Sequence, residues 1–175
     1  MKSRWDLPEK TVAAWRNLWF HTGDAGHVDV DGWFHFVDRL GDRIRRRAEN
    51  ISSYEIESAA ALYPAVRECA AIGVPSGYES DDDIKLVVAL QPGHAWLPND
   101  LLEHLVRLLP HYMVPRYLQR IEALPRTPTN KVMKSQLRAA VGECWDRKAA
   151  GVALRDVARR IGTTAPGAPP SKEST

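Results

Sequence analysis

The segment between residues 64 and 121 restricts the fold more than any other part of the chain. Two apolar, strand-like runs at 68–74 and 84–90 flank a turn-rich acidic loop at 75–83, so they are predicted to pair as neighbouring strands. Leucine and valine recur at three- and four-residue spacing over 98–109, which predicts an amphipathic helix packed on that sheet. A further short strand is predicted at 117–121. The order of elements predicts an α+β domain with a small mixed sheet and packed helices.

Shorter elements are predicted before this sheet. A helix is predicted at 8–17, followed by a β-hairpin over 27–37 around Asp31-Gly32, a dipeptide that favours a tight primed turn. Ser52 or Ser53 is placed to cap a helix that Pro64 ends.

The C-terminal part is predicted to be helical and then unstructured. Short helices are predicted at 131–140 and 149–161, and the second is rich in arginine. Residues 163–175 are mostly Ala, Pro, Gly, Ser and Thr, which bury too little apolar surface to offset the entropy of ordering. We therefore expect a disordered tail.

Charge and composition exclude several classes of partner. Lys and Arg number 24 against 22 Asp and Glu, and a formal net charge of +2 makes neither nucleic acid nor an anionic membrane the default partner. There is no apolar run long enough to span a bilayer and no hydrophobic signal core at the N-terminus, so the expected location is cytoplasmic. Cys69 and Cys144 lie far apart without CxxC spacing, which favours free thiols over a disulfide or a metal site.

A cationic strand face is predicted just after the hairpin. Side chains alternate along an extended segment, so Arg43, Arg45 and Arg47 share one side and Ile44 takes the other. Such a face is either solvated or a binding site for anions, and the density of arginine favours phosphate contacts. Histidines near the hairpin have no supporting carboxylate or cysteine spacing, so no metal ligand is predicted.

Several short motifs follow one another in a specific order. They are WFHTGD at 19–24, GWF at 32–34, DRLGDRIR at 38–45, ENIS at 49–52 and LPRTPTNKV at 124–132. This ordered set resembles the C-terminal region of the adenylate-forming superfamily. Within that superfamily it is similar to AMP-forming acid–CoA ligases and, at a finer level, to the carnitine-CoA ligase group. The resemblance extends from about residue 8 to residue 140.

The resemblance implies a two-step reaction and a domain organisation. In this family a carboxylate attacks the α-phosphate of ATP to form an acyl-adenylate, and CoA then displaces AMP while a small C-terminal domain rotates between the steps. Residues 1–40 would be the last segment of a large N-terminal domain, and 41–141 the mobile lid domain. Residues 142–162 would add a helix before the tail. ATP/AMP and CoA are the implied cofactors, and Mg²⁺ is expected with ATP but has no ligand in this chain.

The resemblance also assigns roles to individual residues. Lys131 matches the lysine that bridges the carboxylate substrate and the α-phosphate during adenylation. Asp24 and Arg39 match residues that contact the ribose, although a surface ion pair with Asp38 or Asp42 is an open alternative for Arg39. Arg45 and Asn50 are placed at the nucleotide.

Other positions match the CoA route and the hinge, and some depart from the family pattern. Arg47 and Ala48 are placed at CoA, and Gly41 and Asp42 at the hinge. Ala48 stands where most members have glycine. Its methyl group would narrow the passage for the CoA thiol chain, which puts the thioester step in doubt. Asn130 also replaces a glycine, which is tolerable because Asn visits left-handed conformations.

The predicted function is that of the C-terminal part of an ATP-dependent, AMP-forming acyl-CoA synthetase. The phosphate loop, acyl pocket and adenine site of such enzymes lie in the large domain, so we expect a truncated or split form with little activity alone. Expected partners are a carboxylic acid, ATP, CoA and a separate large adenylating domain, with no nucleic acid and no membrane span. The alternative is a non-catalytic module that binds nucleotide or CoA or docks onto a partner.

Overall fold

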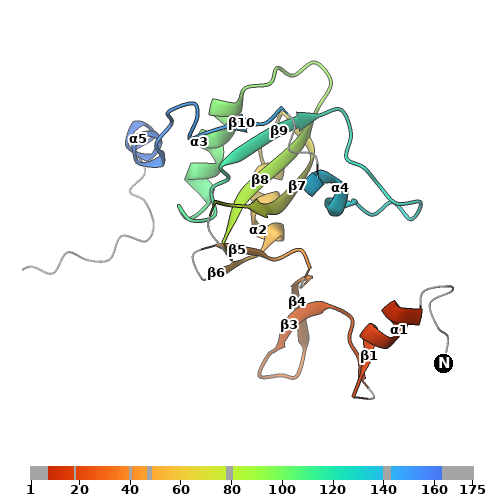
Figure 1. Ribbon diagram of the computed structural model, residues 1–175. Helices are drawn as coiled ribbons and strands as arrows, with labels where there is room; N and C mark the ends of the chain where they lie inside the picture. The colour runs from red at the N-terminus through yellow and green to blue at the C-terminus, as the bar shows by residue number, and fades with distance from the viewer. Residues whose placement is uncertain are drawn as a thin grey trace, which may run out of the picture. The chain divides into compact units, whose positions relative to one another are not determined.

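The computed structural model describes residues 8–17, 19–39, 41–46, 49–77, 81–139 and 143–162. The chain divides into two compact units, Met1–Gly41 and Asp42–Thr175 (Figure 1). The boundary lies beside the border predicted at residue 40. The predicted disordered tail, 163–175, lies outside the described residues.

The first unit consists of a short helix and two small antiparallel ladders. Helix α1 covers Pro8–Ala14, and β1 (Trp15–Arg16) pairs with β2 (Trp19–Phe20). The helix predicted at 8–17 therefore ends at Ala14, and Asn17 has a left-handed φ of 53°. The predicted hairpin is confirmed as β3 (Asp24–Val28) paired with β4 (Phe34–Arg39).

The turn of this hairpin is wider than the predicted two-residue turn. Val28 pairs with Phe34, so residues 29–33 form the loop. The Asp29 carboxylate accepts hydrogen bonds from the backbone N–H groups of Asp31 (3.0 Å) and Trp33 (2.9 Å). It also contacts His35 Nε2 at 2.5 Å, and this hydrogen bond lowers the pKa of Asp29. The Asp29 side chain thus closes the loop, and the Asp31-Gly32 dipeptide alone does not predict this contact.

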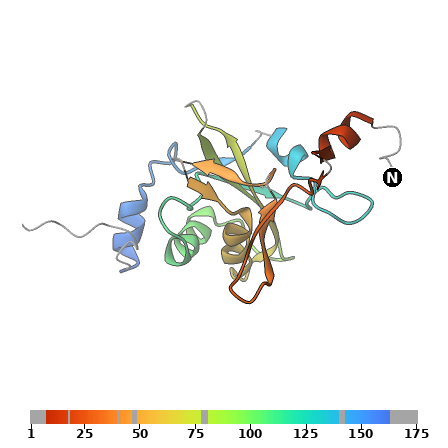
Figure 2. The same cartoon turned by 90° about the horizontal axis from the view of Figure 1, so that it is seen from below.

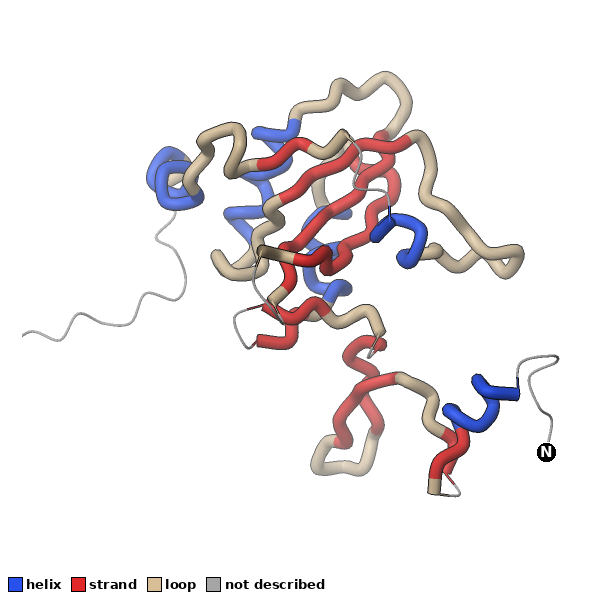
Figure 3. The backbone as a smooth tube through the Cα atoms, in the orientation of Figure 1, coloured by secondary structure: helices blue, strands red, loops and turns tan. Residues whose placement is uncertain are grey.

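The second unit is built on a four-stranded mixed sheet in the order β10-β9-β8-β7 (Figure 3). Strands β7 (Val66–Pro75) and β8 (Asp82–Leu90) are antiparallel, and β9 (Tyr117–Ile121) is parallel to β8. The strands predicted at 68–74, 84–90 and 117–121 are therefore confirmed. The edge strand β10 (Trp145–Asp146), antiparallel to β9, was not predicted.

Helices cover both faces of this sheet (Figure 2). Helices α2 (Ser53–Ala61) and α3 (Pro98–Leu108) bury Ile56 and Leu105 against Leu86 of β8. The side chains of α5 (Leu154–Arg160) extend the same core. On the opposite face Leu137 of α4 (Lys134–Ala139) packs with Val87. Burial of these apolar faces is the main force that holds the layers together.

Two helices begin later than predicted. The helix predicted at 131–140 begins at Lys134, because residues 125–133 fold into a turn. The helix predicted at 149–161 begins at Leu154, because residues 147–151 form a turn in which Gly151 has a φ of 70°.

The remaining predictions about this unit concern its thiols and membrane spans. Cys69 and Cys144 are free, as predicted, and both are half-buried. Burial raises the pKa of the Cys69 thiol to about 12. Among the described residues, no helix combines the length and apolar character that crossing a membrane requires.

Candidate functional site

Lys131 lies at the end of a tight turn that its own backbone helps to close. The backbone N–H of Thr127 donates to the Lys131 carbonyl at 2.8 Å, and the Lys131 N–H donates to Thr127 Oγ1 at 3.1 Å. An isolated antiparallel bridge between Arg126 and Val132 closes the base of the turn. The Lys131 residue is exposed, so this turn presents a cation to solvent on a constrained backbone.

Asn130 provides the backbone conformation that this turn requires. Its φ is 63°, which is in the left-handed region, and its N–H donates to the Thr127 carbonyl at 2.9 Å. Asparagine is among the few non-glycine residues that adopt this region readily. The departure from glycine at this position is therefore accommodated, in line with the prediction.

Helix α4, which follows this turn, is anchored by two lysines. Lys134 Nζ lies 2.8 Å from Glu57 Oε1 and donates to Ser53 Oγ at 2.7 Å, so it links α4 to α2. Lys85, which is 1% exposed, donates from Nζ to the Leu137 carbonyl at 3.2 Å. A cation at the carbonyls of a helix end is electrostatically favourable.

A small hairpin carries the cationic strand. Strand β5 (Ile44–Arg46) pairs with β6 (Glu49–Ile51) and places Arg45 directly opposite Asn50. Both of these residues are exposed, so the structure brings together two positions predicted to bind nucleotide.

The alternation predicted for this strand is present. Ile44 is buried in the core and Arg45 is exposed, whereas Arg46 points inward and donates from Nη1 to the Val114 carbonyl at 3.3 Å. One arginine of the cluster therefore serves the fold. Arg47 and Ala48, predicted at the CoA route, lie outside the described residues.

The predicted ribose-binding pair lies in the first unit. Asp24 and Arg39 are direct partners across the β3–β4 ladder, so the register brings the two positions together. Asp24 is exposed, and its N–H donates to Thr22 Oγ1 at 3.1 Å next to Gly23, whose φ is 79°.

The predicted hinge coincides with the border between the two units, which falls between Gly41 and Asp42. Among the described residues, no atom lies within 4 Å of the position that a Cβ at Gly41 would take. Asp42 Oδ1 lies 3.6 Å from Arg138 Nη2 of α4. The described part of the chain contains no cluster of three or more His, Cys, Asp or Glu residues suited to a metal ion.

Comparison with known proteins identifies a family for part of this chain. The AMP-binding enzyme C-terminal domain family matches residues 55–131, the segment that runs from α2 to the exposed Lys131. Residues 55–131 form an AMP-binding enzyme C-terminal domain.

Relatives of this AMP-binding enzyme C-terminal domain extend the likeness beyond residues 55–131. A feruloyl-CoA synthase of Amycolatopsis sp. is 39% identical over 142 residues, which are 81% of this chain and 29% of the relative. A crotonobetaine/carnitine–CoA ligase of Salmonella arizonae is 34% identical over 138 residues, 78% of this chain and 26% of the relative. The chain thus spans less than a third of the length of these relatives. A carnitine–CoA ligase is therefore among the relatives, as the resemblance indicated.

Solved structures share the fold of the domain. ATP-bound MatB of Rhodopseudomonas palustris matches with a TM-score of 0.68 and 32% identity, covering 79% of this chain and 27% of MatB. This chain therefore shares the fold of a part of MatB.

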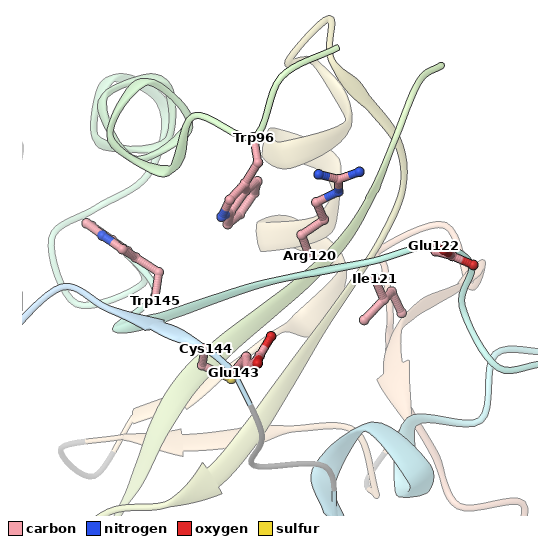
Figure 4. A pocket seen from close by; sticks show the side chains of 7 residues that line it. All are labelled: Trp96, Arg120, Ile121, Glu122, Glu143, Cys144 and Trp145. Carbon is pink, nitrogen blue, oxygen red and sulfur yellow. The ribbon is translucent and has the colours of Figure 1, made fainter. Parts of the chain in front are cut away.

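The second unit also has a cavity of about 550 Å³ at the β9–β10 edge of its sheet. Trp96, Arg120 and Trp145 line it together with four other residues (Figure 4). Neither Lys131 nor Arg45 is among the lining residues. Lys131 and Arg45 are exposed and therefore lie outside this cavity.

Sequence reasoning missed the residues that hold the lysine turn. Glu57 and Lys134 are 77 positions apart, and Glu68 is 58 positions from Arg126, with which it forms an ion pair. The only local signal was the placement of Glu57 on α2 and of Arg126 in the motif at 124–132.

Proposed function

We propose that this chain acts as the mobile C-terminal domain of an ATP-dependent, AMP-forming acid–CoA ligase. The observation that carries the proposal is the exposed Lys131 on a constrained turn within the matched domain. Roughly three quarters of each relative's length lies beyond the match, and we infer that a large domain holds the nucleotide and the acid.

Each half-reaction gives the chain a defined task. In the first step the carboxylate oxygen attacks the α-phosphorus of ATP and the bond to the bridging β-phosphate oxygen breaks, releasing pyrophosphate. Lys131 would donate to the carboxylate and α-phosphate oxygens as charge moves between them, and a preorganised donor of this kind contributes about 3 kcal/mol. Any Mg²⁺ that accompanies ATP would be held largely by its phosphates.

In the second step the CoA thiolate attacks the acyl carbonyl, and AMP leaves with the electron pair of the mixed-anhydride bond. We infer that rotation at Gly41 and Asp42 withdraws Lys131 and brings the β5–β6 hairpin to the site. Its exposed Arg45 offers a fork of donors suited to phosphate. Asp24 and Arg39, paired across β3 and β4, would take the ribose hydroxyls.

Exposed apolar side chains in the first unit support a large neighbouring domain. Trp19, Trp33 and Phe34 are 75%, 72% and 63% exposed. Large exposed aromatic residues of this kind mark surfaces that pack against a partner. We infer that the large domain covers them.

Pyrophosphate release tests the proposal. The purified chain is mixed with ATP, CoA and a panel of acids that includes ferulate, carnitine and fatty acids, alone and with the large domain of a related ligase. We expect acid-dependent release only in the mixture, because the site needs both parts. Nucleotide or CoA binding by the chain alone, with no pyrophosphate release in the mixture, would contradict the proposal and favour a non-catalytic binding module.

A further inference from the structure

The turn that carries Lys131 is tied to the sheet through one guanidinium group. Arg126 Nη1 donates to the Asn130 carbonyl at 2.9 Å, and Arg126 Nη2 forms an ion pair with the Glu68 carboxylate on β7. The same side chain therefore contacts both the backbone next to Lys131 and a strand in the middle of the chain. A planar guanidinium suits this bridging because its donors lie in a fixed fork.

The contact between Arg126 and the Asn130 carbonyl fixes the peptide group that joins Asn130 to Lys131. The Asn130 carbonyl and the Lys131 N–H belong to one planar peptide unit. Arg126 holds the carbonyl of this unit, and Thr127 Oγ1 accepts from its N–H at 3.1 Å. With both polar atoms of the peptide held, the direction in which the Lys131 side chain leaves the backbone is set.

Glu68 is in the charged form that this tether requires. The hydrogen bond from Arg126 is the main cause that lowers the pKa of Glu68. The Arg126 and Glu68 side chains are 37% and 24% exposed. Partly exposed ion pairs add little to global stability. The pair is thus better suited to orienting the turn than to stabilising the fold.

We propose that Arg126, held by Glu68, is the positioning residue that sets the orientation of Lys131. The inference rests on the proposed function, since an orientation matters only where Lys131 meets a substrate. Arg126 itself touches no reacting atom in this scheme and acts through the Asn130–Lys131 peptide.

Amide hydrogen exchange on the full chain tests the tether independently of activity. Arg126→Gln and Glu68→Gln are expected to speed exchange of the Thr127 and Lys131 N–H groups about 10-fold, the effect of losing one charge-assisted hydrogen bond. Amides of β8 should exchange at the wild-type rate. Two variants are used so that poor folding of one leaves the other informative.

Arg67→Gln is the matched control. Arg67 Nε lies 3.3 Å from Glu68 Oε1, and its Nη2 donates to the Glu122 carbonyl at 2.7 Å. Arg67 contacts Glu68 but makes no described contact with Arg126 or with the Lys131 turn, so exchange at the turn should change much less than in the other two variants. Wild-type exchange in the Arg126 and Glu68 variants, or equal acceleration in Arg67→Gln, would overturn the inference.

Kinetics with the large domain test the consequence for catalysis. Arg126→Gln is expected to lower kcat of adenylation about 10-fold, with the KM for ATP and the thioester step from preformed acyl-adenylate unchanged. Equal losses in both half-reactions would overturn the positioning role. Adenylation that survives Lys131→Ala would instead overturn the proposed function, and the exchange result would then describe a tether without a catalytic task.

Discussion

Lys131→Ala is expected to lower adenylation about 100- to 1,000-fold in the enzyme assembled with a large domain, the effect of removing one preorganised donor from a transition state. Adenylation is measured as acid-dependent exchange of pyrophosphate into ATP. The thioester step, measured from synthetic acyl-adenylate and CoA, should change less than about threefold, because the proposed rotation removes Lys131 from that step.

The substitution should leave the fold intact, since Lys131 is exposed. Surface substitutions of this kind usually change the free energy of unfolding by less than about 0.5 kcal/mol. Lys148→Ala removes another exposed lysine of the same unit and is the matched control, expected to leave both half-reactions unchanged. Equal losses in the two half-reactions on Lys131→Ala would contradict the assigned role.

Arg116→Ala is expected to lower the free energy of unfolding of the second unit by about 2–3 kcal/mol. Arg116 lies 2.7 Å from Asp83 Oδ2 and 2.8 Å from Asp146 Oδ2, so it joins β8 to the edge strand β10. The Asp83 side chain is only 8% exposed, and removal of its partner leaves a nearly buried charge uncompensated. Urea unfolding at neutral pH measures the loss.

Lowering the pH should reduce the difference in the free energy of unfolding between the wild type and Arg116→Ala. Hydrogen bonding from Arg116 lowers the pKa of Asp146 in the folded state. The ion pair therefore contributes its full stabilisation above the unfolded-state pKa of about 4, and this stabilisation is lost as the pH falls through the folded-state pKa.

Arg155→Ala is the control, because Arg155 is 83% exposed and its removal should lower the free energy of unfolding by less than about 0.5 kcal/mol. A loss for Arg116→Ala no larger than the control would contradict the account.

The sheet could be predicted because its strands carry their own pattern. The strand at 117–121 and the core of β7 and β8 match the structure, since long apolar runs must be buried whatever surrounds them. Strand β10 spans two residues, and no local pattern reveals the ion pair between Asp146 and Arg116 that helps to hold it.

The site could be predicted only in part for a similar reason. The motif at 124–132 indicated Lys131, but the start of α4 depends on the turn closed by Thr127 and Asn130. The tether from Arg126 to Glu68 joins positions 58 residues apart. Such long-range pairs depend on tertiary packing, and the roles of Asp24, Arg39, Arg45 and Asn50 stay predictions.

Affinity labelling tests the central claim most directly, namely that Lys131 meets the phosphates of a nucleotide held by another domain. The assembled enzyme is treated with an ATP analogue that carries an amine-reactive aldehyde on its terminal phosphate, reduced, digested and mapped by mass spectrometry. We expect the label on Lys131, suppressed by excess ATP, and not on Lys134, which is held by Glu57 and Ser53. ATP-protected labelling confined to the large domain, with Lys131 unmodified, would contradict the account.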